Sequence, residues 1–298
     1  MKINHFPFLE KGDQVGVAAP SARFDKTRLQ QGIDCLKSMG FEVRVPAQIF
    51  DQKRYLAGED ACRAQVIHDL VTDPDIKAII CARGGFGVLR MLSYLDWNLI
   101  QSHPKLFVGF SDTTALLTTV MQQANIGVIH GPNLVSLADA ELLTRTAFLD
   151  AVTGRVSRLS ISRGLCVVPG RAEGVLVGGN LATLAHLLGT EFSPDFSQGV
   201  VFLEDIGEPA YKIDRMLTQM KLAGRFAHIQ GVITGSFEHC DHPEYLPEIV
   251  AEIFGEYQVP VVMGLDAGHG RVNLSLPMGC RVHLDTHAMT LKWQKANR

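Results

Sequence analysis

Short apolar runs alternate with amphipathic segments over the first half of the chain. The apolar runs lie at 14–19, 41–46, 76–82, 105–110 and 127–131. Between them, segments such as 25–40, 59–73 and 113–125 carry apolar residues at helical spacing. This alternation is typical of βαβ units, in which a mostly parallel sheet is covered by helices on both faces. The pattern therefore predicts an α/β fold with a parallel N-terminal sheet flanked by helices.

The amino-acid composition of the sequence changes after about residue 151. The stretch 153–180 is rich in Gly, Arg and Ser and leads into segments with strand character. Such a composition is typical of a domain boundary. We expect an N-terminal domain over 1–155, a linker over 156–167, and a smaller C-terminal α/β or α+β domain over 168–298. In the second half, strands are predicted near 200–205, 231–237, 259–264, 281–286 and 289–293, and helices near 180–188, 210–222 and 244–257.

Composition narrows the class of ligand. The chain of 298 residues has a formal net charge of −3, and it contains no run rich in Lys and Arg. A protein whose main partner is nucleic acid or an anionic membrane has a strongly basic surface, and this composition excludes one. It favours a small ligand instead. The six cysteines form no C-x-x-C pair, so they indicate neither a disulfide framework nor a thiolate zinc site. The N-terminal segment lacks a signal-peptide pattern, and no long apolar segment follows, which predicts a cytoplasmic protein without a membrane partner.

A serine lies on a sharp turn after one predicted strand. The segment 105–120 reads as an apolar strand, a turn with Gly109, Ser111 and Asp112, and then a helix. A serine between strand and helix has its hydroxyl held away from the sheet, beside backbone N–H groups at the start of the helix. That geometry suits a nucleophile. The alternative is that Ser111 or Asp112 caps the helix, because both residue types are common at that position.

A glycine-rich turn follows the predicted strand at 76–82. Gly84, Gly85 and Gly87 allow backbone N–H groups to approach an anion or a developing oxyanion closely. The spacing is not that of a dinucleotide site, because Arg90 occupies the position of the last glycine in G-x-G-x-x-G. A structural glycine turn is the alternative. Arg83 is a candidate for binding a substrate carboxylate, or it pairs with a surface acid.

Two segments of the second half carry acid and base candidates. Glu204 and Asp205 end an apolar strand, and Glu208 follows in the next turn. His269 lies between two glycines just after another strand, where an imidazole is open to act as a base. A carboxylate at a strand end can orient such a histidine, and both Glu204 and Glu208 are candidates for that role. Structural acids and a bystander histidine are the alternatives.

Metal chemistry has little support in the sequence. His239, Cys240, Asp241 and His242 form a compact cluster, but they lack the H-E-x-x-H arrangement and precede Pro243 in a predicted loop. His283 and His287 are four residues apart in a segment with strand alternation, which does not bring them onto one ligand. We expect no metal and no organic cofactor.

Several uncommon motifs occur together and in a fixed order. These are GFSDTT at 109–114, LEDIGEPAYKIDRML at 203–217 and GLDAGHG at 264–270, together with AAPS at 18–21, ARGGFG at 82–87 and GGNLATLAHLLGT at 178–190. Taken together they resemble the LD-carboxypeptidases, the serine peptidase family that includes murein tetrapeptide carboxypeptidases and microcin C self-immunity peptidases. The resemblance extends over nearly the whole chain.

The resemblance implies a catalytic triad assembled from both domains. Ser111 would be the nucleophile, His269 the general base and Glu204 the carboxylate that orients it. The backbone N–H groups of Gly85 and Asp112 would form the oxyanion hole.

The resemblance also implies a substrate. It is a cytoplasmic murein tetrapeptide, cut between meso-diaminopimelate and the terminal D-alanine during cell-wall recycling, by a muramoyltetrapeptide carboxypeptidase that is a homodimer. One alternative is a microcin C-type immunity peptidase acting on peptidyl or aminoacyl nucleotides. An aromatic side chain in the second domain that stacks on the adenine would favour this alternative, and Tyr245 is the one obvious candidate. A second alternative is a non-catalytic peptide-binding protein with two domains.

Overall fold

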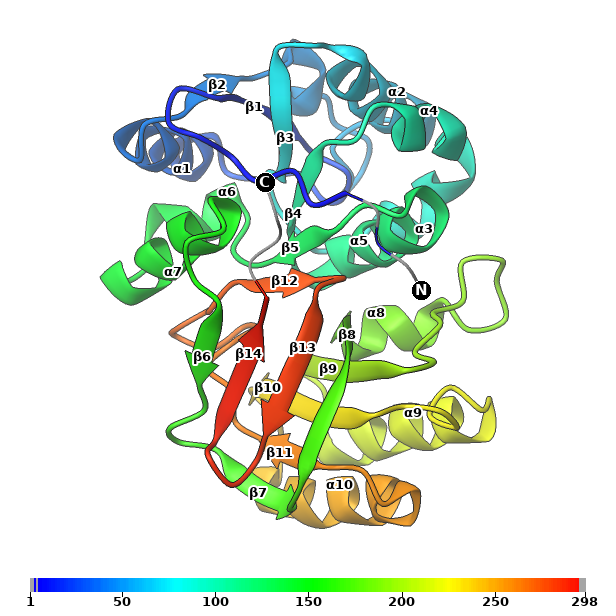
Figure 1. Cartoon of the computed structure of the whole chain (residues 1–298). Helices are drawn as coiled ribbons and strands as arrows, with labels where there is room; N and C mark the ends of the chain where they lie inside the picture. Colours follow the sequence, from blue (N-terminus) through cyan, green and yellow to red (C-terminus); the bar gives the residue numbers. More distant parts are fainter. Residues whose placement is uncertain (1–2, 4, 295–298) are drawn as a thin grey trace. The chain divides into compact units, whose positions relative to one another are not determined.

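The chain folds into two compact units, which are described separately (Figure 1). The computed structural model describes residue 3 and residues 5–294. Of the described residues, the N-terminal unit contains those up to Gly154 and, from the far end of the chain, Leu274–Pro277. The C-terminal unit contains Arg155–Asn273 and the described residues from Met278 onward. The chain therefore passes back into the N-terminal unit once before it ends.

The N-terminal unit is built on a six-stranded sheet with the order β12-β5-β4-β3-β1-β2. Neighbouring strands from β2 to β5 are parallel. Because β3 and β4 are buried along almost their whole length, they lie under helices on both faces, as the apolar runs predict. The strands are β1 (Gln14–Ala18), β2 (Glu42–Arg44), β3 (Ile76–Cys81), β4 (Leu106–Gly109), β5 (Val128–His130) and β12 (Leu276–Met278).

Helices flank this sheet on its two sides (Figure 1). On one side α1 packs against α6, and on the other α2 packs against α3 and α4. The helix expected at 113–125 is divided into a 3-10 turn, the short α5 and a π-helical turn. The helices are α1 (Lys26–Ser38), α2 (Asp60–Thr72), α3 (Val88–Met91), α4 (Trp97–Ser102), α5 (Thr114–Thr119), α6 (Leu134–Ala138) and α7 (Leu142–Val152).

The C-terminal unit has an eight-stranded mixed sheet with the order β6-β14-β13-β8-β9-β10-β11-β7. Strands β8 to β11 are parallel in the middle of the sheet, and the outer strands pair antiparallel. The strands are β6 (Arg158–Ser160), β7 (Leu165–Val168), β8 (Arg171–Asn180), β9 (Gly199–Ile206), β10 (Gly231–Glu238), β11 (Val261–Met263), β13 (Arg281–Asp285) and β14 (Thr290–Trp293).

The segment 156–167, expected as a linker, holds β6 and most of β7. β6 pairs with β14 and β7 pairs with β11, so this stretch supplies both edges of the sheet. Edge strands are short and exposed, and polar residues on them discourage pairing with other chains. The Gly-, Arg- and Ser-rich composition therefore belongs to edge strands that leave most side chains in solvent.

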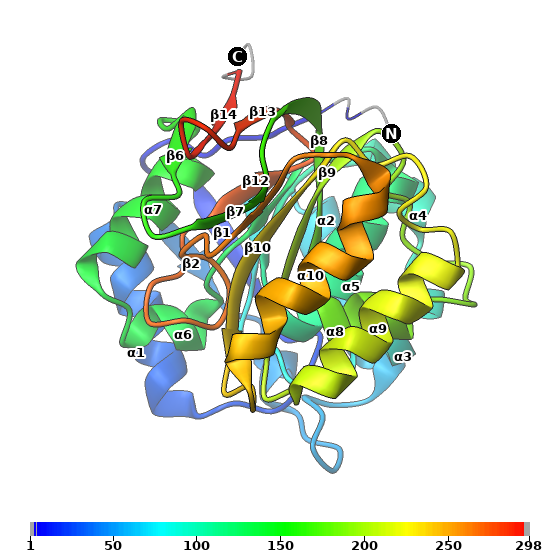
Figure 2. The same cartoon turned by 90° about the horizontal axis from the view of Figure 1, so that it is seen from below.

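Three helices cover one face of the C-terminal sheet. α9 packs between α8 and α10, as Figure 2 shows. Their buried faces meet apolar residues of the parallel strands, including Val201, Leu203 and Val232, in one continuous core. The helices are α8 (Leu181–His186), α9 (Ala210–Leu222) and α10 (Leu246–Phe254). Among the described residues, none of the helices has the length and apolar character needed to cross a membrane.

Candidate active site

Ser111 lies on a strained turn directly after β4. Its φ of +64° places it in the left-handed region, which is uncommon for a residue with a side chain. It opens the 3-10 turn Ser111–Thr113, which leads into α5 without a side-chain cap from Ser111 or Asp112. In the structure, therefore, neither Ser111 nor Asp112 caps α5 with its side chain. Strain of this kind costs about 1–3 kcal/mol and clusters at functional turns such as nucleophile elbows.

Asp112 connects the serine turn to the glycine-rich turn. Its buried carboxylate accepts a hydrogen bond of 3.0 Å from the N–H of Val88, the first residue of α3. Burial raises the pKa of the Asp112 carboxyl, although the Ser21 side chain, the Val88 amide and Arg63 each lower it in part. This bond holds the start of α3 against the turn after β4. The glycine-rich loop before α3 and the serine turn are therefore held next to each other.

The glycine turn approaches the serine side chain closely. A Cβ atom built on Gly84 would lie 2.8 Å from the Ser111 Cβ and 3.0 Å from its Oγ, so only glycine fits there. Gly85 has a φ of +108°, a conformation that residues with side chains rarely adopt. Gly85 and Asp112, the two candidate oxyanion donors, thus lie on the loops that meet at Ser111.

Arg63 is a buried cation that sequence reasoning did not single out. Its guanidinium donates to the carbonyl of Gly87 at 3.0 Å and to that of Pro20, and it pairs with Asp60. The sequence shows only an arginine within the amphipathic segment 59–73, because its partners are backbone carbonyls of distant loops. Arg63 therefore fixes the end of the glycine turn.

Arg83 is exposed, and its guanidinium donates to the carbonyl of Arg23 at 2.8 Å. This bond ties the loop after β3 to the loop after β1. Both loops lie at the carboxyl ends of neighbouring parallel strands, where ligands of such sheets bind. The role of Arg83 in binding a substrate carboxylate stays a prediction.

In the C-terminal unit the structure brings Glu204 and His269 together. Glu204 is fully buried at the end of β9, and its Oε2 lies 2.6 Å from the Nδ1 of His269. A carboxylate only accepts hydrogen bonds, so Nδ1 is the donor, and Nε2 is left as the basic nitrogen of the ring. The His269 side chain is 13% exposed, which leaves part of the ring open to a reactant. This pair can accept a proton and stabilise the resulting imidazolium.

Asp205, next to Glu204, points to the opposite side of β9, as successive residues of a strand do. Its carboxylate accepts from the side chain of Asn180 at 2.9 Å and from the N–H groups of Ala182 and Ile206, both at 2.8 Å. Burial raises the pKa of Asp205 to about 6, and the neighbouring Glu204 adds to the shift. Asp205 thus holds the start of α8, which Asn180 caps.

Glu208, the other candidate for the role of Glu204, lies just before α9. Its Oε2 is 3.6 Å from the Nζ of Lys212, one helical turn away. The structure therefore places Glu204, and not Glu208, on the His269 ring. Ser111 belongs to the N-terminal unit, so the structure describes it separately from the Glu204–His269 pair.

The cluster at 239–242 is engaged in local contacts. Asp241 accepts from the N–H of Ala210 at 2.7 Å, at the start of α9, and His242 lies 3.1 Å from a carboxylate oxygen of Glu244. Within residues 3 and 5–294, no group of three or more His, Cys, Asp or Glu side chains is arranged to hold a metal ion.

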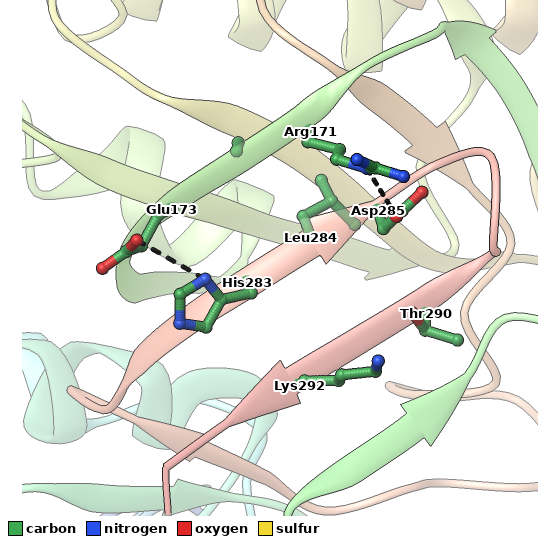
Figure 3. Close-up of a pocket in the computed structure, with 8 residues that line it drawn as sticks. Arg171, Glu173, His283, Leu284, Asp285, Thr290 and Lys292 are labelled. Carbon is green, nitrogen blue, oxygen red and sulfur yellow. Dashed lines mark hydrogen bonds and ion pairs between the residues drawn. The ribbon is translucent and has the colours of Figure 1, made fainter.

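A pocket of about 330 Å³ lies over β8, β13 and β14 (Figure 3). Arg171 pairs with Asp285 at 2.8 Å across it, and His283 lies 3.5 Å from Glu173. These charges satisfy one another on the exposed face of an antiparallel sheet. The pocket is lined by neither Glu204 nor His269, so it is separate from the histidine pair.

Comparison with known proteins assigns both units. The model of the LD-carboxypeptidase N-terminal domain matches residues 15–131, and that of the LD-carboxypeptidase C-terminal domain matches residues 173–284. The chain belongs to the LD-carboxypeptidase family. A probable murein peptide carboxypeptidase of Bacillus subtilis (strain 168) is 35% identical, over 97% of this chain and 94% of the relative. Membership in this family supports a carboxypeptidase role.

Solved structures of relatives share the fold. The microcin C7 self immunity protein MccF superposes with a TM-score of 0.90 at 26% identity, covering 98% of this chain and 99% of the other. The muramoyltetrapeptide carboxypeptidase from Oxalobacter formigenes gives a TM-score of 0.82 at 30% identity, covering 93% of this chain and 97% of the other. The two-domain α/β architecture expected from the sequence is confirmed.

Proposed function

We propose that this chain is a serine LD-carboxypeptidase in which Ser111, His269 and Glu204 form the catalytic triad. The observation that carries the proposal is the 2.6 Å contact between His269 Nδ1 and the buried Glu204 Oε2. A buried carboxylate on Nδ1 fixes the ring tautomer that a general base needs. The strained conformation of Ser111 supports its assignment as nucleophile.

The reaction is an acyl transfer in two steps. The Oγ of Ser111 attacks the scissile carbonyl carbon while the Nε2 of His269 takes its proton, and a tetrahedral intermediate forms. When the C–N bond breaks, His269 returns the proton to the leaving amine, and an acyl ester remains on Ser111. Water, deprotonated by His269, then hydrolyses the ester and restores the serine.

The glycine turn and Asp112 supply the electrostatic part of the mechanism. The N–H groups of Gly85 and Asp112 stabilise the oxyanion of the intermediate, an effect typically worth about a hundredfold or more in rate per donor. Arg83 binds the terminal carboxylate of the peptide. Its position on a loop at the carboxyl end of β3 supports this role.

The proposed substrate is a cytoplasmic murein tetrapeptide, from which the enzyme removes the terminal D-alanine in cell-wall recycling. The names of the relatives from Bacillus subtilis and Oxalobacter formigenes support this choice. We further propose that the protein works as a homodimer, which size-exclusion chromatography with light scattering tests directly.

The experiment incubates the pure protein with L-Ala-γ-D-Glu-meso-DAP-D-Ala and follows free D-alanine by mass spectrometry. Wild type is compared with Ser111→Ala and with Ser102→Ala, a matched control on the exposed end of α4. We expect release by wild type and Ser102→Ala and none by Ser111→Ala. Turnover by Ser111→Ala, or loss of activity on adding EDTA, would contradict the serine mechanism.

The second candidate is a peptidase for aminoacyl or peptidyl nucleotides. The TM-score of 0.90 against the microcin C7 self immunity protein MccF favours it. Tyr245, the aromatic candidate for stacking on a base, is half-exposed, but one ring face packs on His242 with centroids 5.0 Å apart. Hydrolysis of an aminoacyl sulfamoyl adenosine, with the murein peptide left intact, would select this function. Binding of the peptide without turnover would select a non-catalytic role.

A further inference from the structure

The main chain is held on both sides of His269 by polar side chains. On the N-terminal side, the N–H of Gly268 donates to the Oδ1 of Asn273 at 3.1 Å. On the C-terminal side, the N–H of Gly270 donates to the Oγ of Ser236 at 3.0 Å. Asn273 is buried and Ser236 is half-buried. The backbone amides of the two glycines that flank the histidine are therefore both held by hydrogen bonds.

Ser236 also ties the beginning of the histidine loop to β10. Its N–H donates to the carbonyl of Ala267 at 3.0 Å, and its Oγ lies 3.4 Å from the same oxygen. Gly235 allows this approach, because a Cβ atom there would lie 2.3 Å from the Ala267 oxygen. The Ser236 hydroxyl thus links two points of the loop, at 267 and 270, to one strand.

The contact between His269 and Glu204 depends on this loop. Glu204 is buried on β9 and cannot follow a displaced ring, because it pairs with Asn180 of β8 and because β10 pairs with the residues just before and after it. A hydrogen bond of 2.6 Å weakens steeply when its donor moves or tilts. The position of the His269 main chain therefore decides whether the imidazole meets the carboxylate.

We propose that Ser236 and Asn273 are positioning residues for the general base, holding the His269 backbone so that Nδ1 stays aligned with Glu204. This role rests on the proposed function of His269. Neither residue takes part in proton transfer. Ser236 acts through the Gly270 amide, and Asn273 acts through the Gly268 amide.

The kinetic test compares Ser236→Ala and Asn273→Ala with wild type on the murein tetrapeptide. We expect kcat to fall about 10- to 100-fold, since misplacement by about 1 Å can cost a hundredfold, with KM changed less than about twofold. Ser236→Thr keeps a hydroxyl and restores most of kcat. Ser160→Ala, an exposed serine on β6 of the same unit, is the matched control and keeps wild-type kcat.

A spectroscopic test separates positioning from general stability and from the identity of the substrate. In the NMR spectrum of the wild type, the Nδ1 proton of His269 gives a strongly downfield signal, which Glu204→Gln removes. We expect Ser236→Ala and Asn273→Ala to lose or shift that signal while they unfold cooperatively, and Ser236→Thr to retain it. If Asn273→Ala fails to fold, Ser236→Ala carries the test, because its side chain is half-buried.

The outcomes distinguish the two proposals. Loss of the signal and of kcat in the variants supports the positioning role. An unchanged signal and unchanged kcat in Ser236→Ala overturn it, even if the wild type is active. Absence of wild-type activity on both substrate classes overturns the proposed function alone, because the NMR comparison does not depend on turnover.

Discussion

Gly268 lies so close to Glu204 that no other residue fits beside the histidine. A Cβ atom at Gly268 would be 2.5 Å from the Oε2 atom that bonds to His269, and 2.9 Å from the Glu204 Cβ. The φ of Gly268 is +107°, which disfavours a side chain as well. The glycine before the histidine is thus required by both the backbone conformation and the carboxylate.

Gly268→Ala is expected to separate the carboxylate from the imidazole. Because Glu204 is fully buried between strands, the histidine loop must shift, and kcat should fall by a hundredfold or more. Gly189→Ala is the control, since Gly189 also has a positive φ, +81°, but nothing lies within 4 Å of its added Cβ. Steady-state kinetics and thermal unfolding of both variants check this. Equal losses of activity in the two would mean that backbone strain alone is responsible.

Glu204→Gln is expected to lower kcat by roughly a thousandfold while the fold is kept. An amide in place of the carboxylate removes the negative charge that fixes the tautomer and stabilises the imidazolium. Glu208→Gln should change kcat by less than about twofold, because Glu208 pairs with Lys212 on α9. Initial rates of D-alanine release measure both. A larger loss in Glu208→Gln would reassign the third triad position.

The periodicity of the sequence was sufficient for the fold class. Apolar runs located β1, β3, β4 and β5, because strands covered on both faces need almost continuous apolar residues, and the run at 41–46 also located the short edge strand β2. The linker expected at 156–167 proved to contain β6 and most of β7, since short edge strands can have the composition of a loop. The return of Leu274–Pro277 to the N-terminal unit had no local signal, because it depends on long-range packing.

The chemistry of the site was only partly visible in the sequence. Glu204 and His269 stood out because each lies at a strand end in an uncommon motif. The resemblance of these motifs to a known family then implied a role for each residue. Ser236 and Asn273 did not stand out, because what marks them is that each accepts a hydrogen bond from a backbone amide, Ser236 from a residue 34 positions away and Asn273 from one 5 positions away. Such contacts involve common residue types and become visible only in the folded structure.

Gly84→Ala is expected to disturb the nucleophile without unfolding the protein. Its Cβ would meet the Ser111 side chain at 2.8 Å, so the hydroxyl must leave its position, and acylation should slow about 10- to 100-fold. Gly255→Ala serves as the control, because its added Cβ meets nothing within 4 Å and its φ is −59°. Detection of the acyl-enzyme by mass spectrometry at short times gives the rate. Wild-type acylation in Gly84→Ala would show that Ser111 is not confined by the glycine turn.

Asp205 gives the stability of the protein a defined dependence on pH. Its pKa is raised from 3.8 to about 6, chiefly by burial, so the folded state binds more protons than the unfolded state between about pH 4 and 6. The contribution of Asp205 to the free energy of unfolding is therefore largest below that window. It decreases as the pH rises through it, by about 3 kcal/mol at most for a shift of this size.

Asp205→Asn tests this dependence. The variant loses an acceptor for the Ala182 N–H, which should cost about 1–3 kcal/mol when the group is buried. Since asparagine does not titrate, the deficit relative to wild type should be larger at pH 4.5 than at pH 7.5. Urea unfolding at both pH values measures it, with Asp214→Asn, an exposed residue on α9, as the control. A deficit that grows with pH would mean that the three accepted hydrogen bonds outweigh burial and hold the Asp205 pKa below 3.8 in the folded protein.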